Sequence, residues 1–122
     1  MNSNAKILIV DDDPLNVELL EELLDDYDCF VATSGEETLK MVPQCKPDLV
    51  LLDVTMPGIS GYEVCKKLKE NQSINRSKII FISGRSTVSE KDKGYQSGAD
   101  DYIIKPFEEE ELFTKIQMCL EA

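Results

Sequence analysis

The sequence lacks the long apolar runs of a membrane protein, because no stretch approaches the roughly 20 apolar residues that span a bilayer. The N-terminal segment Met-Asn-Ser-Asn-Ala-Lys also lacks the apolar stretch of a signal peptide. No C-x-x-C pair occurs among the four cysteines, and a chain of this length does not need disulfides, so we expect four buried thiols: Cys29, Cys45, Cys65 and Cys119. These absences favour a cytoplasmic protein without membrane contact.

Basic residues are scarce, since 13 Lys and Arg stand against 24 Asp and Glu and give a formal net charge of -11. Charge of this sign repels the phosphate backbone of nucleic acids and anionic membrane surfaces. We therefore expect no direct binding to nucleic acid. The charge favours cations and basic partner surfaces, although most of the scattered glutamates fit an ordinary solvated surface.

Short apolar runs alternate five times with helical patterns, which predicts five strands: residues 7–10, 30–32, 49–52, 79–82 and 102–104. The first, third and fourth runs are continuously apolar, as expected for parallel strands that are covered on both faces. The second and fifth are expected to be less deeply buried. With 122 residues, the chain has room for one domain, spanning 1–122.

Five intervening segments carry helix signals. Asp13 is expected to cap the first helix, with Pro14 at its first position. A stripe of leucines is expected to form the buried face of this helix: Leu15, Leu19, Leu20, Leu23 and Leu24. Capping boxes open the next three helices at 34–37, 60–63 and 87–90.

The last two helices differ in their apolar content. The fourth is polar and offers only Val88 and Tyr95 as anchors, so we expect it to be the least stable helix. The fifth has an apolar stripe: Phe107, Leu112, Ile116, Cys119 and Leu120. The strict alternation of strands and helices predicts an α/β fold with a five-stranded doubly wound parallel sheet, flavodoxin-like order 2-1-3-4-5, and helices on both faces.

Several carboxylates follow the strands that adjoin in this order. The first strand runs into Asp11, Asp12 and Asp13, and the third runs into Asp53. Crowded carboxylates repel one another unless a cation or proton intervenes, and oxygen ligands at an open site suit Mg²⁺. Asp13 beside Pro14 is better explained as a helix cap, whereas Asp53 precedes a loop and has no helix to cap.

Two further polar groups end on the same rim of the sheet. The fourth strand is followed by Ser83-Gly84, and the fifth by Lys105-Pro106. Together with a carboxylate and a metal ion, an ammonium and a hydroxyl supply what a bound phosphoryl group needs.

Four segments in chain order resemble the receiver domains of bacterial two-component response regulators, in particular the single-domain chemotaxis-regulator type. They are Asp11-Asp12, the run Leu-Leu-Asp-Val-Thr-Met-Pro-Gly around Asp53, Ser83-Gly84, and residues 98–107, which read Gly-Ala-Asp-Asp-Tyr-Ile-Ile-Lys-Pro-Phe. The likeness spans essentially the whole chain, and four motifs in order are far more specific than one.

The resemblance implies that Asp53 accepts a phosphoryl group from a phosphohistidine on a histidine kinase or histidine phosphotransfer protein, since this chain has no histidine. Lys105 would pair with one phosphoryl oxygen, and Ser83 would donate a hydrogen bond to another. Asp12 and Asp53 would bind Mg²⁺ with the backbone carbonyl of Thr55, and Asp11 would assist largely through water.

The resemblance also implies a switch. Tyr102 would turn inward when Ser83 moves toward the phosphoryl group, and the face formed by the fourth helix, fifth strand and fifth helix would then bind a downstream protein target. A monomer or a weak dimer is expected. The Lys105-Pro106 bond is expected to be cis, and Thr55 and Arg85 would flank the route of attacking water.

Other functions remain open. A Mg²⁺-dependent phosphatase with an aspartate nucleophile would share the acidic motif, although such enzymes usually need a larger domain to exclude water. A phosphorylation-independent binding module would share the fold. An FMN carrier is disfavoured because three aspartates replace its phosphate loop, and a calcium-binding EF-hand is disfavoured because its alternating acidic loop is missing.

Overall fold

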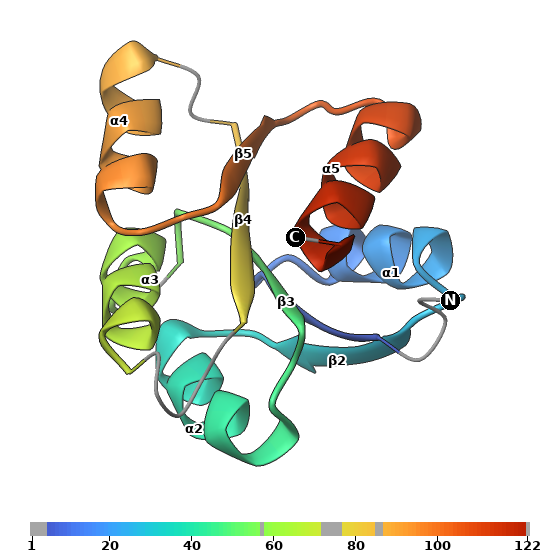
Figure 1. The fold of residues 1–122 in the computed structure, drawn as a ribbon, viewed down its shortest axis with the longest axis horizontal. Helices are drawn as coiled ribbons and strands as arrows, with labels where there is room; N and C mark the ends of the chain where they lie inside the picture. Colours follow the sequence, from blue (N-terminus) through green and yellow to red (C-terminus); the bar gives the residue numbers. More distant parts are fainter. Residues whose placement is uncertain (1–4, 57, 72–76, 85–86, 122) are drawn as a thin grey trace.

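The protein is described by a computed structural model that covers residues 5–56, 58–71, 77–84 and 87–121. It contains a five-stranded parallel sheet of order β2-β1-β3-β4-β5, which confirms the predicted fold class (Figure 1). The strands are β1 (Lys6–Val10), β2 (Asp28–Ala32), β3 (Leu49–Leu52), β4 (Lys78–Ser83) and β5 (Asp101–Ile104). Each predicted strand is therefore present and differs by at most two residues at an end.

Five helices cover the two faces of the sheet, with α1 and α5 on one side and α2, α3 and α4 on the other (Figure 1). They are α1 (Pro14–Leu23), α2 (Gly35–Cys45), α3 (Gly61–Glu70), α4 (Val88–Gln96) and α5 (Glu109–Glu121). The first four begin at the predicted caps, where side-chain oxygens of Asp13, Ser34, Ser60 and Thr87 accept backbone N–H bonds. No helix among the described residues is long and apolar enough to cross a membrane.

The sheet separates two apolar clusters. One lies against α2 and α3 and includes Leu8, Val64 and Phe81, and the other lies against α1 and α5 and includes Ile9, Leu20 and Ile116. All four residues of β3 are buried, whereas the edge strands β2 and β5 carry partly exposed residues, as the sequence predicts. The acidic rim thus rests on the most deeply buried strands.

The predicted buried face of α1 is wrong in part. Leu20 and Leu24 are buried with Val17, but Leu15 is 75% exposed and Leu19 is 47% exposed. The helix turns Val17 toward the sheet, and this rotation leaves Leu15 and Leu19 outside the core. Two leucines are therefore available on the surface.

The predicted anchors of α4 are also wrong. Val88 is 75% exposed and Tyr95 is 48% exposed, whereas Gly94 is the buried residue among those described in this helix. A Cβ atom at Gly94 would lie 2.9 Å from a ring carbon of Tyr102, so the missing side chain lets α4 approach β5 closely. The thiol prediction needs a smaller correction, because Cys65 and Cys119 are buried but Cys29 and Cys45 are partly exposed.

Candidate functional site

Backbone hydrogen bonds align the ends of β1 and β3. The N–H of Asp11 donates to the carbonyl of Ala32 at 3.2 Å, and the N–H of Asp53 donates to the carbonyl of Val10 at 3.0 Å. The strand pairing therefore continues by one residue on each side of β1. Because the strands are parallel, this continuation brings the aspartates that follow them to one edge of the sheet.

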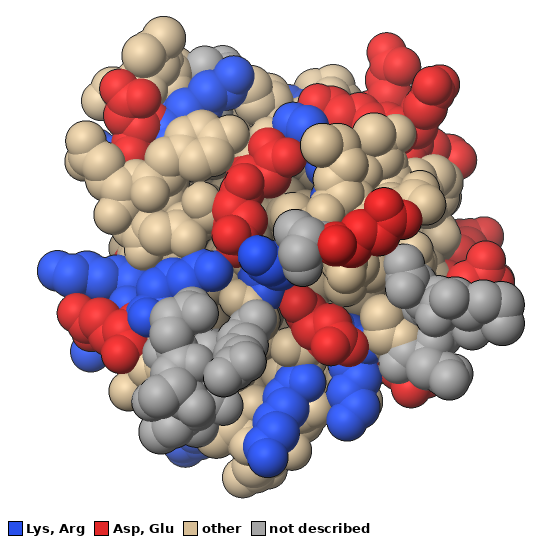
Figure 2. Space-filling view, viewed as in Figure 1, with Lys and Arg blue, Asp and Glu red and all other residues tan. Residues whose placement is uncertain are grey.

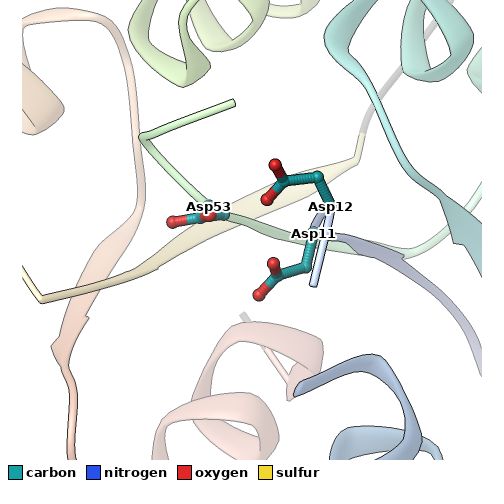
Figure 3. A group of neighbouring side chains, drawn as sticks. All are labelled: Asp11, Asp12 and Asp53. Carbon is teal, nitrogen blue, oxygen red and sulfur yellow. The ribbon is translucent and has the colours of Figure 1, made fainter. Parts of the chain in front are cut away.

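The carboxylates of Asp11, Asp12 and Asp53 form one cluster, in which one oxygen from each lies within 4.8 Å of the others. The side chains of Asp11 and Asp12 point toward the side on which Asp53 lies (Figure 3). Asp11 is buried, Asp53 is partly buried and Asp12 is exposed, so the cluster opens to solvent. Three oxygen donors at this spacing fit a single hard divalent cation.

The surroundings of Asp53 disfavour the ionised form of its carboxyl group. Burial raises the pKa of Asp53 above the ordinary value of 3.8, and the neighbouring charges of Asp11 and Asp12 raise it further. Lys105 and the backbone N–H of Thr55 lower the pKa, but they only partly offset the burial. A cation bound at the cluster would relieve this strain on the ionised form.

Lys105 and Ser83 lie at the same edge. The backbone N–H of Lys105 donates to the carbonyl of Ser83 at 2.8 Å, which joins the ends of β4 and β5. The Lys105 ammonium forms an ion pair of 3.2 Å with the buried carboxylate of Asp11. The Ser83 side chain is buried, and the Lys105-Pro106 peptide bond is cis, as predicted.

The sequence singles out three further residues: Thr55, Asp13 and Arg85. Thr55 is exposed in the loop after β3 and lies two residues beyond Asp53. Asp13 caps α1 as predicted, through a bond from the Leu15 N–H to its carboxylate at 3.0 Å. Arg85 lies outside the described residues.

Sequence reasoning missed the groups that hold the loop after Asp53. The carboxylate of Glu36, at the start of α2, accepts a bond from the N–H of Ile59 at 3.4 Å and lies beside Gly58, which has a φ of 83°. A Cβ atom at Gly61 would lie 2.4 Å from the carbonyl oxygen of Asp53. No local sequence signal could have revealed these contacts, because they join segments that are distant in the chain.

Tyr102 is 3% exposed, so its ring occupies the inward position in this structure. It packs against Phe81, with ring centroids 5.8 Å apart, and Phe81 in turn meets the ring of Tyr62 from α3 at 5.4 Å. Although β5 is an edge strand, the Tyr102 side chain is therefore part of the core.

A surface groove of about 430 Å³ borders the acidic cluster at Lys105. Its lining is mainly apolar and comes from α1 and the segment after β5: Asn16, Leu19, Leu23, Lys105, Pro106, Phe107 and Glu109. The exposure of Leu19 is explained by this position, since its side chain forms a wall of the groove.

The family described as "Response regulator receiver domain" matches residues 7–117. The chain therefore belongs to the response regulator receiver domain family, whose members are signalling switches of two-component systems.

Curated relatives and solved structures support the same family assignment. The chain is 39% identical over 119 residues to the alkaline phosphatase synthesis transcriptional regulatory protein PhoP of Bacillus subtilis, covering 96% of this chain and 49% of that protein. It is 36% identical to the response regulator PleD of Caulobacter vibrioides, covering 93% of this chain and 26% of PleD. A crystal structure of a putative response regulator from Chloroflexus aurantiacus superimposes with a TM-score of 0.92 at 36% identity, covering 98% and 99% of the two chains.

The chain spans between a quarter and a half of the length of these two curated relatives. On the face drawn in Figure 2, charge is unevenly distributed: acidic side chains gather over α5 and α1, and basic side chains over α3 and α2. The exposed run Glu108, Glu109, Glu110 and Glu111 contributes to the acidic side.

Proposed function

We propose that Asp53 accepts a phosphoryl group from a phosphohistidine of a partner protein and that Mg²⁺ is required. The observation that carries the proposal is the cluster in which carboxylate oxygens of Asp11, Asp12 and Asp53 lie within 4.8 Å of one another. The ligands of the ion would be these carboxylates, with Asp11 acting largely through water, and the backbone carbonyl of Thr55. When bound, Mg²⁺ would neutralise charge on the carboxylates and on the phosphoryl oxygens.

The chemical step is an in-line transfer. A carboxylate oxygen of Asp53 forms a bond to phosphorus while the bond from phosphorus to the donor imidazole nitrogen breaks, and the imidazole leaves with the electron pair of that bond. No general base is needed, because Asp53 attacks as a carboxylate. Lys105 would stabilise negative charge on one phosphoryl oxygen, and Ser83 would donate a hydrogen bond to another.

The donor histidine lies outside this sequence, because the 122 residues contain no histidine. We propose that the donor, a histidine kinase or a histidine phosphotransfer protein, contacts the groove between α1 and the segment after β5. This groove supports the proposal because it is apolar and includes Lys105 and Pro106, so a protein bound there would reach the acidic cluster.

We propose that the response is a change at the β5 edge of the sheet. Phosphorylation adds a charge of about −1.5 to −2 at one point, and this charge would draw the Ser83 hydroxyl toward the phosphoryl group. Tyr102 would then be held inward, and the face of α4, β5 and α5 would bind a downstream protein. A monomer or a weak dimer is expected, without direct contact to nucleic acid or membrane.

The test is intact-protein mass spectrometry after treatment with acetyl phosphate, with and without Mg²⁺. Wild type should gain one phosphoryl group in the presence of Mg²⁺, and Asp53→Asn should gain none. Asp48→Asn is a matched control, since Asp48 lies just before β3 at its other end and accepts a bond from the Lys6 N–H that an asparagine can keep. Labelling of Asp53→Asn equal to that of wild type would rule out Asp53 as the acceptor.

Two other functions are distinguished by the same experiment. A Mg²⁺-dependent phosphatase would release phosphate over many turnovers without retaining a stable adduct. A phosphorylation-independent binding module would show neither an adduct nor turnover. The receiver function requires one adduct per chain and its slow loss.

A further inference from the structure

A hydrogen bond joins α3 to α4 on the face of the sheet opposite the groove. The Tyr62 hydroxyl donates to the carboxylate of Glu90 at 2.5 Å and lies 3.2 Å from the Glu90 backbone carbonyl. The Glu90 side chain is only 18% exposed, so this bond is largely shielded from solvent. Hydrogen bonds from a hydroxyl to a carboxylate are about twice as strong as bonds between neutral groups.

The hydroxyl is a donor throughout the ordinary pH range. Burial raises the pKa of Tyr62 well above its usual value, and hydrogen bonds with Glu90 and Tyr102 raise it further. The ammonium of Lys93 lies 3.9 Å from the other Glu90 oxygen, a long and more exposed ion pair on the same helix. Tyr62 is therefore the stronger of these two partners of Glu90.

This bond closes α4 over the ring of Tyr102. Gly94 sits directly against that ring, where a Cβ atom would lie 2.9 Å from one of its carbons. The ring of Phe81 packs against the rings of both Tyr62 and Tyr102, at centroid distances of 5.4 and 5.8 Å. Glu90 and Gly94 are one helical turn apart and thus face the same neighbours.

The remainder of α4 contributes little apolar anchoring. Val88 and Tyr95 are exposed, and Gly94 has no side chain to bury. A helix with so few buried apolar contacts is opened at low free-energy cost. The bond between Tyr62 and Glu90 therefore contributes a large part of the free energy that holds α4 against the sheet.

We propose that Tyr62 and Glu90 are positioning residues for the switch residue Tyr102, because their hydrogen bond holds α4 closed over the Tyr102 ring. The bond sets the equilibrium between closed and open positions of α4. Its meaning for signalling rests on the proposed function, since it regulates how strongly phosphorylation of Asp53 is transmitted to the face of α4, β5 and α5. Both residues act through Tyr102.

Hydrogen exchange of the full, unphosphorylated chain, followed by mass spectrometry, tests the bond directly. Tyr62→Phe keeps the ring against Phe81 and removes only the hydroxyl. We expect the amides of α4 to exchange about tenfold faster in this variant, while those of α2 and α5 stay unchanged. Tyr95→Phe is the matched control: its hydroxyl lies 3.4 Å from Asp101 on an exposed ring, and α4 should exchange as in wild type.

Rescue by a conservative variant separates the bond from general packing. Glu90→Gln keeps an acceptor and should retain most of the protection of α4, whereas Glu90→Leu should resemble Tyr62→Phe. The double variant Tyr62→Phe with Glu90→Leu should exchange no faster than Tyr62→Phe alone, because Tyr62→Phe already removes the bond to Glu90 together with the hydrogen bond between the Tyr62 and Tyr102 side chains. Additive effects, or equal exchange in wild type and Tyr62→Phe, would overturn the proposal, as would faster exchange in every helix.

The same samples, treated with acetyl phosphate and Mg²⁺, keep the two proposals apart. Tyr62→Phe should still gain one adduct at Asp53, because the acceptor is untouched. If wild type gains no adduct, the proposed function fails, while the exchange of α4 still decides whether the bond holds the helix. If the adduct forms and exchange is unchanged, the positioning role fails and the acceptor function stands.

Discussion

The Lys105 ammonium lies 3.2 Å from the carboxylate of Asp11, although 94 positions separate the two residues in the sequence. The pair reaches across β3 and β4, because β1 and β5 are not neighbours in the sheet. Asp11 is buried, and an unpaired buried carboxylate would be costly. Lys105 thus stabilises the acidic cluster and also lowers the pKa of Asp53.

Lys105→Ala should therefore bind Mg²⁺ several-fold more tightly, since a competing positive charge leaves the cluster, and should accept a phosphoryl group at least several-fold more slowly. Isothermal titration with Mg²⁺ and labelling with acetyl phosphate measure the two effects. Lys115→Ala is the control, because Lys115 has similar exposure and pairs with Asp101 at 3.5 Å. Weaker Mg²⁺ binding in Lys105→Ala would contradict this account of the cluster.

Asp53→Asn should be more stable than wild type at neutral pH in the absence of divalent ions. The folded-state pKa of Asp53 is raised, so ionisation destabilises the folded chain. This cost is complete above the folded-state pKa and disappears as the pH falls below the ordinary value of 3.8. The stability difference between the proteins should therefore shrink on acidification.

Urea unfolding in EDTA at neutral and acidic pH measures this difference. Asp48→Asn serves as control and should gain no stability at neutral pH. Equal stability of wild type and Asp53→Asn at neutral pH, or a difference that widens on acidification, would refute the explanation by burial and like charge.

Gly61→Ala should displace the backbone at the acceptor residue Asp53. The added Cβ would lie 2.4 Å from the carbonyl oxygen of Asp53 and 2.9 Å from the Cα of Val54, and both are backbone atoms that must shift. We expect a loss of about 1–3 kcal/mol in the free energy of unfolding. Phosphoryl acceptance should also slow, because the loop that carries Thr55 moves.

Gly84→Ala is the matched control for this variant, since among the described residues, its chain neighbours aside, no atom lies within 4 Å of a Cβ at that position. Urea unfolding and the rate of labelling with acetyl phosphate compare the two proteins. Wild-type behaviour of Gly61→Ala in both measurements would show that the loop has room for the methyl group.

Leu19→Ser should separate recognition of the donor from chemistry. Leu19 is a partly exposed wall of the groove, so its loss should change the free energy of unfolding by less than about 1 kcal/mol. Transfer from a phosphorylated histidine phosphotransfer protein should become slower, whereas labelling by phosphoramidate should be unchanged. Thr114→Ala, on an exposed position of α5, is the control. Equal slowing with both donors would assign Leu19 to the acceptor site itself.

The sequence predicts the strands and the acidic edge well because their signals are local. Continuous apolar runs identify β1, β3 and β4, and the aspartates follow directly, so the parallel topology brings them together. The N-caps are local for the same reason. Each depends on a side chain that bonds to a backbone group within two or three positions.

The errors occur where burial depends on distant partners. Leu19 has the same chemistry as Leu20, and periodicity alone cannot tell a core residue from the wall of a surface groove. Gly94 is buried because it meets Tyr102, and Glu90 meets Tyr62 on another helix. Such contacts depend on how elements pack, which a one-dimensional pattern does not contain.

The alternation of side chains along β4 and β5 has a consequence for how the domain can diversify. Phe81 and Tyr102 project into the layer of α2 and α3, whereas Ile80, Ile82 and Ile103 project into the layer of α1 and α5. The sheet thus separates the groove that we propose for the donor from the packed rings of Tyr62, Phe81 and Tyr102. In an engineered receiver, the exposed residues of α1 could be replaced so that the domain accepts a phosphoryl group from a new donor. The aromatic rings beneath α4, and with them the binding of the original downstream protein, would stay unchanged.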